Sequence, residues 1–337
     1  MPLLNKMLFS SSLALGTLIA VSSYSWMGMW LGLEINLLSF MPLISSTKNT
    51  LSSESSLKYF ITQAMASSLL LFSLILLSMN SPYFIELNIL LNVFLNMSLL
   101  LKMGAAPLHF WFPEVMEGLS WLNSLILLTW QKIAPMVLLL YSSKTPYLIL
   151  IVIISCMLVS GIMGQNQTSL RKIMAYSSIN HIGWMLAAMM FEEIIWLSYF
   201  IIYTIITLNI LILFKKMNIN TVNQMVVVIN NQPNLKLFFS LNFLSLGGLP
   251  PFLGFLPKWL TIQVLINKSL FLVSTIMILA TLMTLFFYIQ VTFSTLTFST
   301  NTTFSMKMPT HLMFFMASSN LAALIGLILV TVAFNLT

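Results

Sequence analysis

Apolar runs of about 20 residues dominate the chain and follow one another with short polar breaks. A run of that length lets an α-helix cross the hydrocarbon core of a bilayer. Only 6% of the 337 residues are charged and 59% are hydrophobic, whereas soluble domains carry roughly 25% charged residues. The sequence therefore excludes a soluble globular domain and predicts an all-α, polytopic integral membrane protein.

Eleven apolar segments can be counted along the chain. Turn signals such as Ser81-Pro82 and Thr145-Pro146 mark several boundaries, because proline disfavours helix in the residue before it. The predicted segments are 4–22, 25–46, 58–79, 85–118, 122–142, 147–165, 172–190, 194–214, 237–266, 269–293 and 312–334. Glycine and proline interrupt 85–118 and 237–266, so we expect these two helices to be discontinuous. Polar residues predict long connections at 218–234 and 294–311.

The basic residues divide unequally between the two sides of such a topology. Nine lie on the N-terminal side and in the even-numbered loops: Lys6, Lys48, Lys58, Arg171, Lys172, Lys215, Lys216, Lys236 and Lys307. The odd-numbered loops hold only Lys144 and Lys268. Because loops on the inner side are richer in Lys and Arg, this bias predicts an inner N-terminus and, with eleven spans, an outer C-terminus.

The sequence contains no recognisable binding site for a metal ion, a nucleotide or a redox centre. Cys156 is the single cysteine, there is no aspartate, and the three histidines lack metal-ligand spacing. Neither a dinucleotide-binding glycine motif nor a phosphate-binding loop is present. We therefore expect no cofactor or metal bound by this chain, and we attribute its net charge of +7 to membrane topology rather than to nucleic-acid binding.

The stretch 99–118, LLLKMGAAPLHFWFPEVMEG, carries the most unusual chemistry of the chain. Lys102 ends a long apolar run, and the helix-breaking sequence Gly-Ala-Ala-Pro follows it. A bare ammonium and freed backbone groups are both costly in a bilayer, so they persist mainly where they line a buried, hydrated path. This stretch is the first candidate for a functional site.

Three further charges fall within apolar segments: Glu34, Lys132 and Lys258. Each intramembrane charge costs about 2.5 to 3.5 kcal/mol on insertion scales. The four together, Lys102 included, cost on the order of 10 kcal/mol, which is comparable to the net stability of a whole domain. They must therefore be paired, hydrated or neutral.

These groups have the chemistry of a proton relay. A buried ammonium is disfavoured and a nearby carboxylate favours it, so a change in the partner charge makes a lysine release or take up a proton. Glu34 and Lys102 could form such a pair. His109 and His181 could bridge the chain, since imidazole changes charge near physiological pH. Two plainer interpretations stay open: lysines near a boundary extend to the interface, and the histidines are packing residues.

An internal repeat connects the two glycine- and proline-rich stretches. LLKMGAAPLHFWF at 100–112 overlays FLSLGGLPPFLGF at 243–255 with an offset of 143, which aligns Gly104 with Gly247 and Lys102 with Ser245. A second overlay aligns Asn36 with Asn180 at an offset of 144. We predict one membrane domain, 1–337, with halves at about 1–143 and 147–293, an extra helix at 312–334, and the opposite orientations of an inverted repeat.

Three motifs make the chain resemble the NADH–ubiquinone oxidoreductase chain 2 family, which belongs to the antiporter-like, proton-pumping subunits of respiratory complex I. They are LLLKMGAAPLHFWFPEVMEG, NQTSLRKIMAYSSINHIGWM and NFLSLGGLPPFLGFLPKWL, and WLGLEINLLSF supports them. The resemblance implies a multi-pass protein of the mitochondrial inner membrane, with a matrix N-terminus and an intermembrane-space C-terminus. It also implies other complex I membrane subunits, the phospholipid bilayer, protons and ordered water as partners. Flavin and iron–sulfur clusters are expected in other subunits of the complex.

The resemblance assigns roles to the buried charges. It implies that Glu34 and Lys102 form the ion pair of the family, that Lys132 is its central lysine, and that Lys258 is the proton site of the far half. The implied function is proton translocation driven by electron transfer from NADH to ubiquinone in other subunits. The alternative is an autonomous cation/proton antiporter, which members of this family also resemble.

Overall fold

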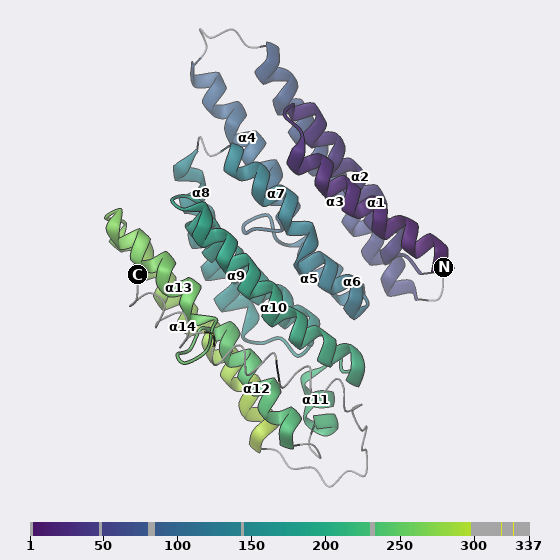
Figure 1. Cartoon of the computed structure of the whole chain (residues 1–337), viewed down its shortest axis with the longest axis vertical. Coiled ribbons are helices and arrows are strands. Elements are labelled where there is room, and N and C mark those ends of the chain that lie inside the picture. The colour runs from purple at the N-terminus through teal and green to yellow at the C-terminus, as the bar shows by residue number, and fades with distance from the viewer. Residues whose placement is uncertain are drawn as a thin grey trace. The chain divides into compact units, whose positions relative to one another are not determined.

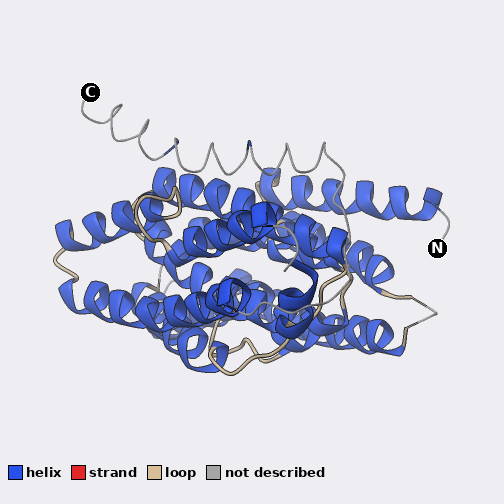
Figure 2. Cartoon of the chain, turned by 90° about the horizontal axis from the view of Figure 1, so that it is seen from below, coloured by secondary structure: helices blue, strands red, loops and turns tan. Residues whose placement is uncertain are grey.

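The structure, a computed structural model, describes residues 3–46, 49–79, 85–142, 145–229 and 233–297, together with Ser318 and Gly326. Its described part consists of helices and their connections, without strands (Figure 2). The helices are α1 (Leu3–Ser22), α2 (Trp26–Ile44), α3 (Thr50–Met79), α4 (Ile85–Met103), α5 (Trp111–Gly118), α6 (Trp121–Leu128), α7 (Trp130–Tyr141), α8 (Pro146–Gly164), α9 (Leu170–Met189), α10 (Glu193–Met217), α11 (Val222–Ile229), α12 (Pro233–Gly247), α13 (Phe255–Asn267) and α14 (Phe271–Thr297).

The helices confirm the predicted fold class. Each of the first ten predicted segments is helical, and 85–118 and 237–266 are interrupted as expected, between α4 and α5 and between α12 and α13. Within the described residues, seven helices are long and apolar enough to cross a membrane, with α6 and α7 taken together as one span. The predicted segment 312–334 and most of the connection 294–311 lie outside the described residues.

Two local predictions were wrong. Helix α3 begins at Thr50 rather than at 58, because its first serines donate to carbonyls three residues back and so remain helical. The connection 218–234 contains α11, whose start carries a capping box: Gln224 N–H donates to Thr221 Oγ1, and Thr221 N–H donates to Gln224 Oε1. The predicted segment 122–142 is confirmed as one apolar span, Trp121–Tyr141, in which Thr129 alone separates α6 from α7.

The chain divides into two compact units, residues 1–152 and 153–337, and passes from one to the other within α8. In the first unit, α1 packs on α2, α2 on α3, α3 on α4 and α5, and α4 on α7 (Figure 1). In the second unit, α9 packs on α10 and α13, and α12 packs on α10 and α14.

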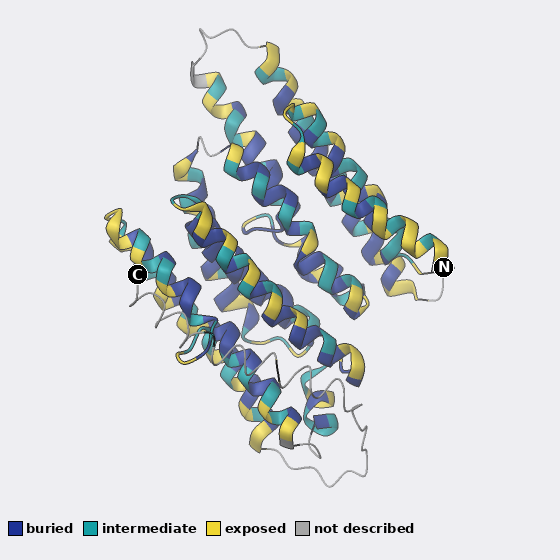
Figure 3. Cartoon of the chain, viewed as in Figure 1, coloured by how far each residue is buried: buried dark blue, intermediate teal, exposed yellow. Residues whose placement is uncertain are grey.

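Many of the helices turn leucine, isoleucine, methionine and phenylalanine outward as well as inward, whereas α9 exposes none of these residues. The exposed residues of α1, α3, α10 and α14 (Figure 3) include many of these apolar types. Large exposed apolar surface is unusual in a soluble monomer, whereas a lipid-facing helix requires it. Many buried polar residues, by contrast, lie on the inner faces of the same helices.

The backbone corrects the register of the internal repeat. Helix α4 ends at Met103 and α12 at Gly247, while α5 begins at Trp111 and α13 at Phe255, and both differences are 144. The two glycines with positive φ are Gly104 (74°) and Gly248 (76°), again 144 apart. The predicted offset of 143 for this pair was wrong by one residue, and the true offset equals that of the second overlay. The counterpart of Lys102 is therefore Leu246, not Ser245.

Candidate functional site

Lys102 lies in the last turn of α4, directly before the break, and is 7% exposed. Gly104 ends the helix in the left-handed conformation, which glycine adopts without steric cost. Its N–H donates to Leu101 O (3.1 Å), and Trp111 Nε1 donates to the same carbonyl (3.1 Å). Groups within and just after the break thus provide hydrogen bonds to the carbonyl of Leu101 at the end of α4. Lys102, beside it, lies inside the first unit.

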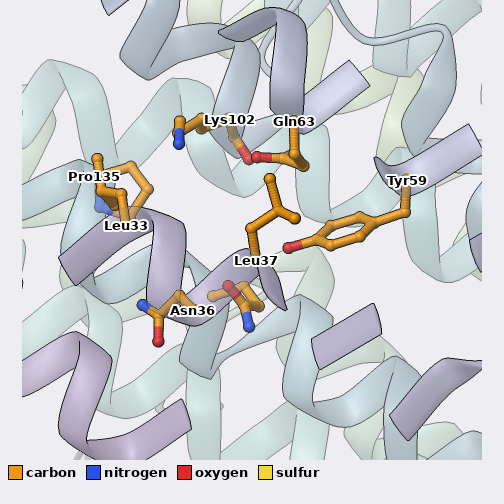
Figure 4. A pocket seen from close by; sticks show the side chains of 8 residues that line it. Leu33, Asn36, Leu37, Tyr59, Gln63, Lys102 and Pro135 are labelled. Atoms are coloured by element: carbon orange, nitrogen blue, oxygen red, sulfur yellow. The ribbon is translucent and has the colours of Figure 1, made fainter. Parts of the chain in front are cut away.

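A small cavity adjoins Lys102. Its walls come from α2, α3, α4 and α7 (Figure 4), and they are formed by Leu33, Asn36, Leu37, Tyr59, Gln63, Lys102, Gln131 and Pro135. The centre of a water-sized sphere can occupy about 10 Å³ of this cavity. Gln63 Nε2 donates to the backbone carbonyl of Lys102 (3.3 Å), which fixes the backbone beside this space.

Glu34 lies on α2 and is half-buried. Its carboxylate interacts electrostatically with the Lys102 ammonium, but no ion pair of 4.0 Å or less joins the two groups among the described residues. Lys58, on the exposed start of α3, makes close ion pairs instead, with Glu54 (2.8 Å) and with Glu114 (2.9 Å). The pairing of Glu34 with Lys102 stays a prediction.

Lys132 is the most deeply buried of the three lysines, at 1% exposed. It lies in the first turn of α7, and its Nζ is 5.8 Å from the centroid of the Phe112 ring of α5. A cation over an aromatic face is attracted to the ring electrons, most strongly where water is excluded. Pro135, three residues on, has no N–H for the carbonyl of Gln131.

Lys258 belongs to the second unit, in the first turn of α13, and is 6% exposed. Its Nζ donates to the carbonyls of Leu246 (3.2 Å) and Gly247 (2.8 Å), which are the last residues of α12. The C-terminal end of a helix carries partial negative charge, so it stabilises a cation. The Trp184 ring of α9 lies 5.8 Å from the same nitrogen.

The two candidate histidines are both 4% exposed and lie in different surroundings. His109 lies within the first break, where its Nδ1 is 3.2 Å from Pro107 O and its ring stacks on Phe110 at 4.5 Å. His181 lies on α9, where its Nδ1 is 2.8 Å from Tyr199 OH and its ring is 5.0 Å from that of Tyr203. Each hydrogen bond fixes the orientation of its imidazole.

The structure groups the predicted residues by unit. Lys102 and Lys132 lie on the packed helices α4 and α7, with Glu34 on α2, whereas Lys258 and His181 lie in the second unit. The sequence did not single out Tyr59, Gln63 and Gln131, which line the cavity beside Lys102, or Tyr199, which hydrogen-bonds His181 in the second unit. The spacing of Tyr59 and Gln63 could have indicated that both polar side chains lie on one face of their helix, since residues four apart are neighbours on a helix surface.

No group of three or more metal-ligating side chains occurs in the part of the chain that the structure describes.

Comparisons with known proteins agree with this arrangement. Residues 23–284 match the family model described as NADH:quinone oxidoreductase/Mrp antiporter, TM. A NADH-ubiquinone oxidoreductase chain 2 from Anopheles gambiae is 52% identical over 289 residues, 85% of this chain and 84% of the relative. Another, from Aedes aegypti, is 46% identical over 97% of both chains.

Two solved structures share the fold. A chain of respiratory complex I from Thermus thermophilus superposes with a TM-score of 0.85 at 22% identity, over 95% of this chain and 77% of that one. A chain of the Mrp complex from Dietzia sp. DQ12-45-1b gives 0.76 at 16% identity, over 89% and 62%. With the family model covering most of the chain, this protein belongs to the NADH:quinone oxidoreductase/Mrp antiporter membrane family, among the proteins named NADH-ubiquinone oxidoreductase chain 2.

Proposed function

We propose that this chain is a core membrane subunit of respiratory complex I in the mitochondrial inner membrane, where it translocates protons through Glu34, Lys102, Lys132 and Lys258. The observation that carries the proposal is the burial of three lysines, 7%, 1% and 6% exposed, in helices of a membrane protein. Each buried charge costs about 2.5 to 3.5 kcal/mol. Packing alone does not offset this cost at three positions. A group that carries protons across the membrane, by contrast, has to lie inside it.

The surroundings of these lysines suit both protonation states. Lys258 as an ammonium is stabilised by the carbonyls at the end of α12, and Lys102 by the electrostatic interaction with Glu34. A change in a neighbouring charge alters that balance and moves a proton on or off the amine. His109 and His181 are further relay members, since both are buried and held by a defined hydrogen bond.

Two five-span halves form the framework of this relay. Helices α1, α2 and α3 correspond to α8, α9 and α10 at an offset close to 144, the interrupted fourth spans are α4–α5 and α12–α13, and the fifth spans are α6–α7 and α14. Because five spans are an odd number, the second half crosses the membrane in the direction opposite to the first. Discontinuous helices near the midplane are the usual ion sites of such inverted repeats.

Electron transfer supplies the energy in this proposal and takes place in other subunits. The flavin and iron–sulfur clusters belong there, as does the oxidation of NADH by ubiquinone, and this chain contributes no redox site. Its partners are the neighbouring membrane subunits, the phospholipid bilayer, ordered water and the transported protons.

The test is Lys102→Ala in the assembled complex. We expect normal assembly and a lower number of protons translocated per NADH oxidised, because the variant lacks one proton carrier. Lys268→Ala is the matched control, since Lys268 is an exposed lysine at the end of α13. An assembled Lys102→Ala complex with undiminished coupling would reject Lys102 as a relay member.

The second candidate function is an autonomous cation/proton antiporter, which the structural similarity to a chain of the Mrp complex favours. Purification in mild detergent separates the two functions. A complex I subunit is recovered in a large assembly with flavin and iron–sulfur absorbance, whereas recovery as a free exchanger contradicts our proposal.

A further inference from the structure

One aromatic side chain of α5 lies against both the first helix break and Lys132. Phe112 is 1% exposed, and the centroid of its ring is 5.8 Å from Lys132 Nζ on α7. The same side chain touches Gly104, the left-handed glycine that follows α4, since a Cβ built on Gly104 would lie 3.0 Å from Phe112 Cβ and Cδ2. The end of α4 and the amine of α7 therefore meet at a single phenylalanine.

The break fixes the position of Phe112. Its N–H donates to His109 O within the break (2.9 Å). Its ring packs edge-on against that of Trp111, with the centroids 5.5 Å apart and the planes at 85°. Trp111 Nε1 in turn donates to Leu101 O in the last turn of α4 (3.1 Å). Because these contacts connect the start of α5 with the end of α4, a change in the conformation of the break moves the Phe112 ring.

The second unit has a different arrangement at the equivalent place. There the glycine with positive φ is Gly248, and a Cβ built on it would lie 2.7 Å from Cδ of Lys258 itself. At the offset of 144, the counterpart of Phe112 is Leu256, which has no ring. The second glycine thus touches the side chain that carries the amine. In the first unit Phe112 takes that place, and the amine beyond it belongs to Lys132.

The ring can act on Lys132 only through its position and its electrons. Phenylalanine has no group that titrates or forms a conventional hydrogen bond, so Phe112 does not carry a proton. An aromatic face attracts an ammonium, most strongly where water is excluded, and both Phe112 and Lys132 are 1% exposed. The contact therefore stabilises the charged form of the amine for as long as the ring stays in place.

We propose that Phe112 is a positioning residue for Lys132, through which the conformation of the first break determines the contacts of this amine. The inference rests on the proposed function. With the break as the structure has it, the ring stabilises the Lys132 ammonium. When the break rearranges, the ring moves with the start of α5 and the ammonium loses this contact. Since Lys102 lies directly before the break, one phenylalanine links the surroundings of the two lysines.

The test is Phe112→Leu in the assembled complex, which removes the ring and keeps an apolar side chain. We expect proton-coupled turnover to fall about threefold to tenfold, as for the loss of one cation–aromatic contact. Phe112→Tyr keeps the ring and should retain most of the native turnover. Phe94→Leu is the matched control, because Phe94 of α4 is 41% exposed. If Phe112→Leu does not assemble, Phe112→Met replaces it.

A double-mutant cycle shows whether Phe112 acts through the amine. Lys132→Met keeps the length of the side chain and removes its charge. Phe112→Leu should lower turnover no further in the Lys132→Met complex, because the ring then has no ammonium to position. A packing role of the ring would instead lower turnover by the same factor in both backgrounds, as independent sites do. In high-resolution cryo-electron microscopy maps, Lys132 Nζ should lie beside the ring in the native complex and be displaced in Phe112→Leu.

The outcomes separate this inference from the proposed function. The inference is overturned by an assembled Phe112→Leu complex with native turnover or an unmoved Lys132 amine. Equal losses in Phe112→Leu and Phe112→Tyr, or an undiminished loss in the Lys132→Met background, overturn it as well. If Lys132→Met lowers coupling in the same experiments, the relay itself stands. If Lys132→Met leaves coupling unchanged, the proposed function fails at Lys132 together with the inference.

Discussion

At the scale of single residues, the buried lysines are stabilised by different groups. Lys258 Nζ lies on two carbonyls at the end of α12, Lys132 Nζ faces an aromatic ring, and Lys102 adjoins a polar cavity. The three amines are therefore expected to respond differently to substitutions of their neighbours.

The surroundings of Lys258 give a prediction at Gly248. Its φ is 76°, and a Cβ there would lie 2.7 Å from Lys258 Cδ and 2.9 Å from its Nζ. We expect Gly248→Ala to cost about 1 to 2 kcal/mol from the left-handed backbone alone, and to push the ammonium away from Leu246 and Gly247. Proton translocation per NADH, measured in the assembled complex, should fall.

The adjacent glycine provides the control. A Cβ on Gly247 would meet its nearest atoms at 3.6 Å or more, which is ordinary van der Waals contact. Gly247→Ala should therefore assemble and translocate protons close to the native level. Equal effects of the two substitutions would show that the position of the Lys258 side chain is not responsible.

At the scale of helices, interruptions occur where the polar residues gather. The break between α4 and α5 follows Lys102, the break between α12 and α13 precedes Lys258, and Pro135 lies inside α7 beside Lys132. Each interruption frees backbone groups that would otherwise bond within a helix. Freed carbonyls are the acceptors that a buried ammonium or a water molecule needs.

Helix α7 gives the corresponding test. Pro135→Ala restores the N–H that the carbonyl of Gln131 lacks, so α7 should become more stable locally while coupled turnover falls. Hydrogen–deuterium exchange over residues 131–139 should become slower. Pro42→Ala is the control, because Pro42 lies inside α2 and not on the cavity. Faster exchange, or a gain in coupling, would contradict the role assigned to the freed carbonyl.

At the scale of the whole molecule, the distribution of apolar surface and of basic residues sets how the chain lies in the bilayer. Exposed apolar side chains cover the outer faces of the described helices. Lys215 and Lys216 end α10, and Lys268 follows α13. The proposed topology places the first two on the matrix side and Lys268 on the other, in accordance with the bias of inner loops toward Lys and Arg.

Cysteine labelling tests this orientation with little background, because Cys156 is the single cysteine of the chain and is buried. In intact mitoplasts, a membrane-impermeant maleimide should label Lys268→Cys and leave Lys216→Cys unmodified. Opening the membrane should expose Lys216→Cys, since that side chain is exposed in the structure. The reverse pattern would invert the proposed topology.

The sequence by itself determined the all-helical membrane class, the positions of nearly all described helices and the three buried lysines. These follow from local features. An apolar run of bilayer length forms a membrane helix, and the free-energy cost of placing a charge in such a run does not depend on which helices lie next to it. It also located both helix breaks, because glycine and proline act on their own backbone. It missed α11, although the capping box was legible in Thr221 and Gln224.

Only the tertiary structure decided the register of the repeat and the partners of the lysines. Gly247 and Gly248 are adjacent, and the sequence did not show which of them ends α12; in the structure Gly248 takes the positive φ and lies against Lys258. The cavity of Lys102 joins side chains from four helices that are up to 102 positions apart, from Leu33 to Pro135. Such contacts depend on how helices pack, which no local pattern of residues encodes.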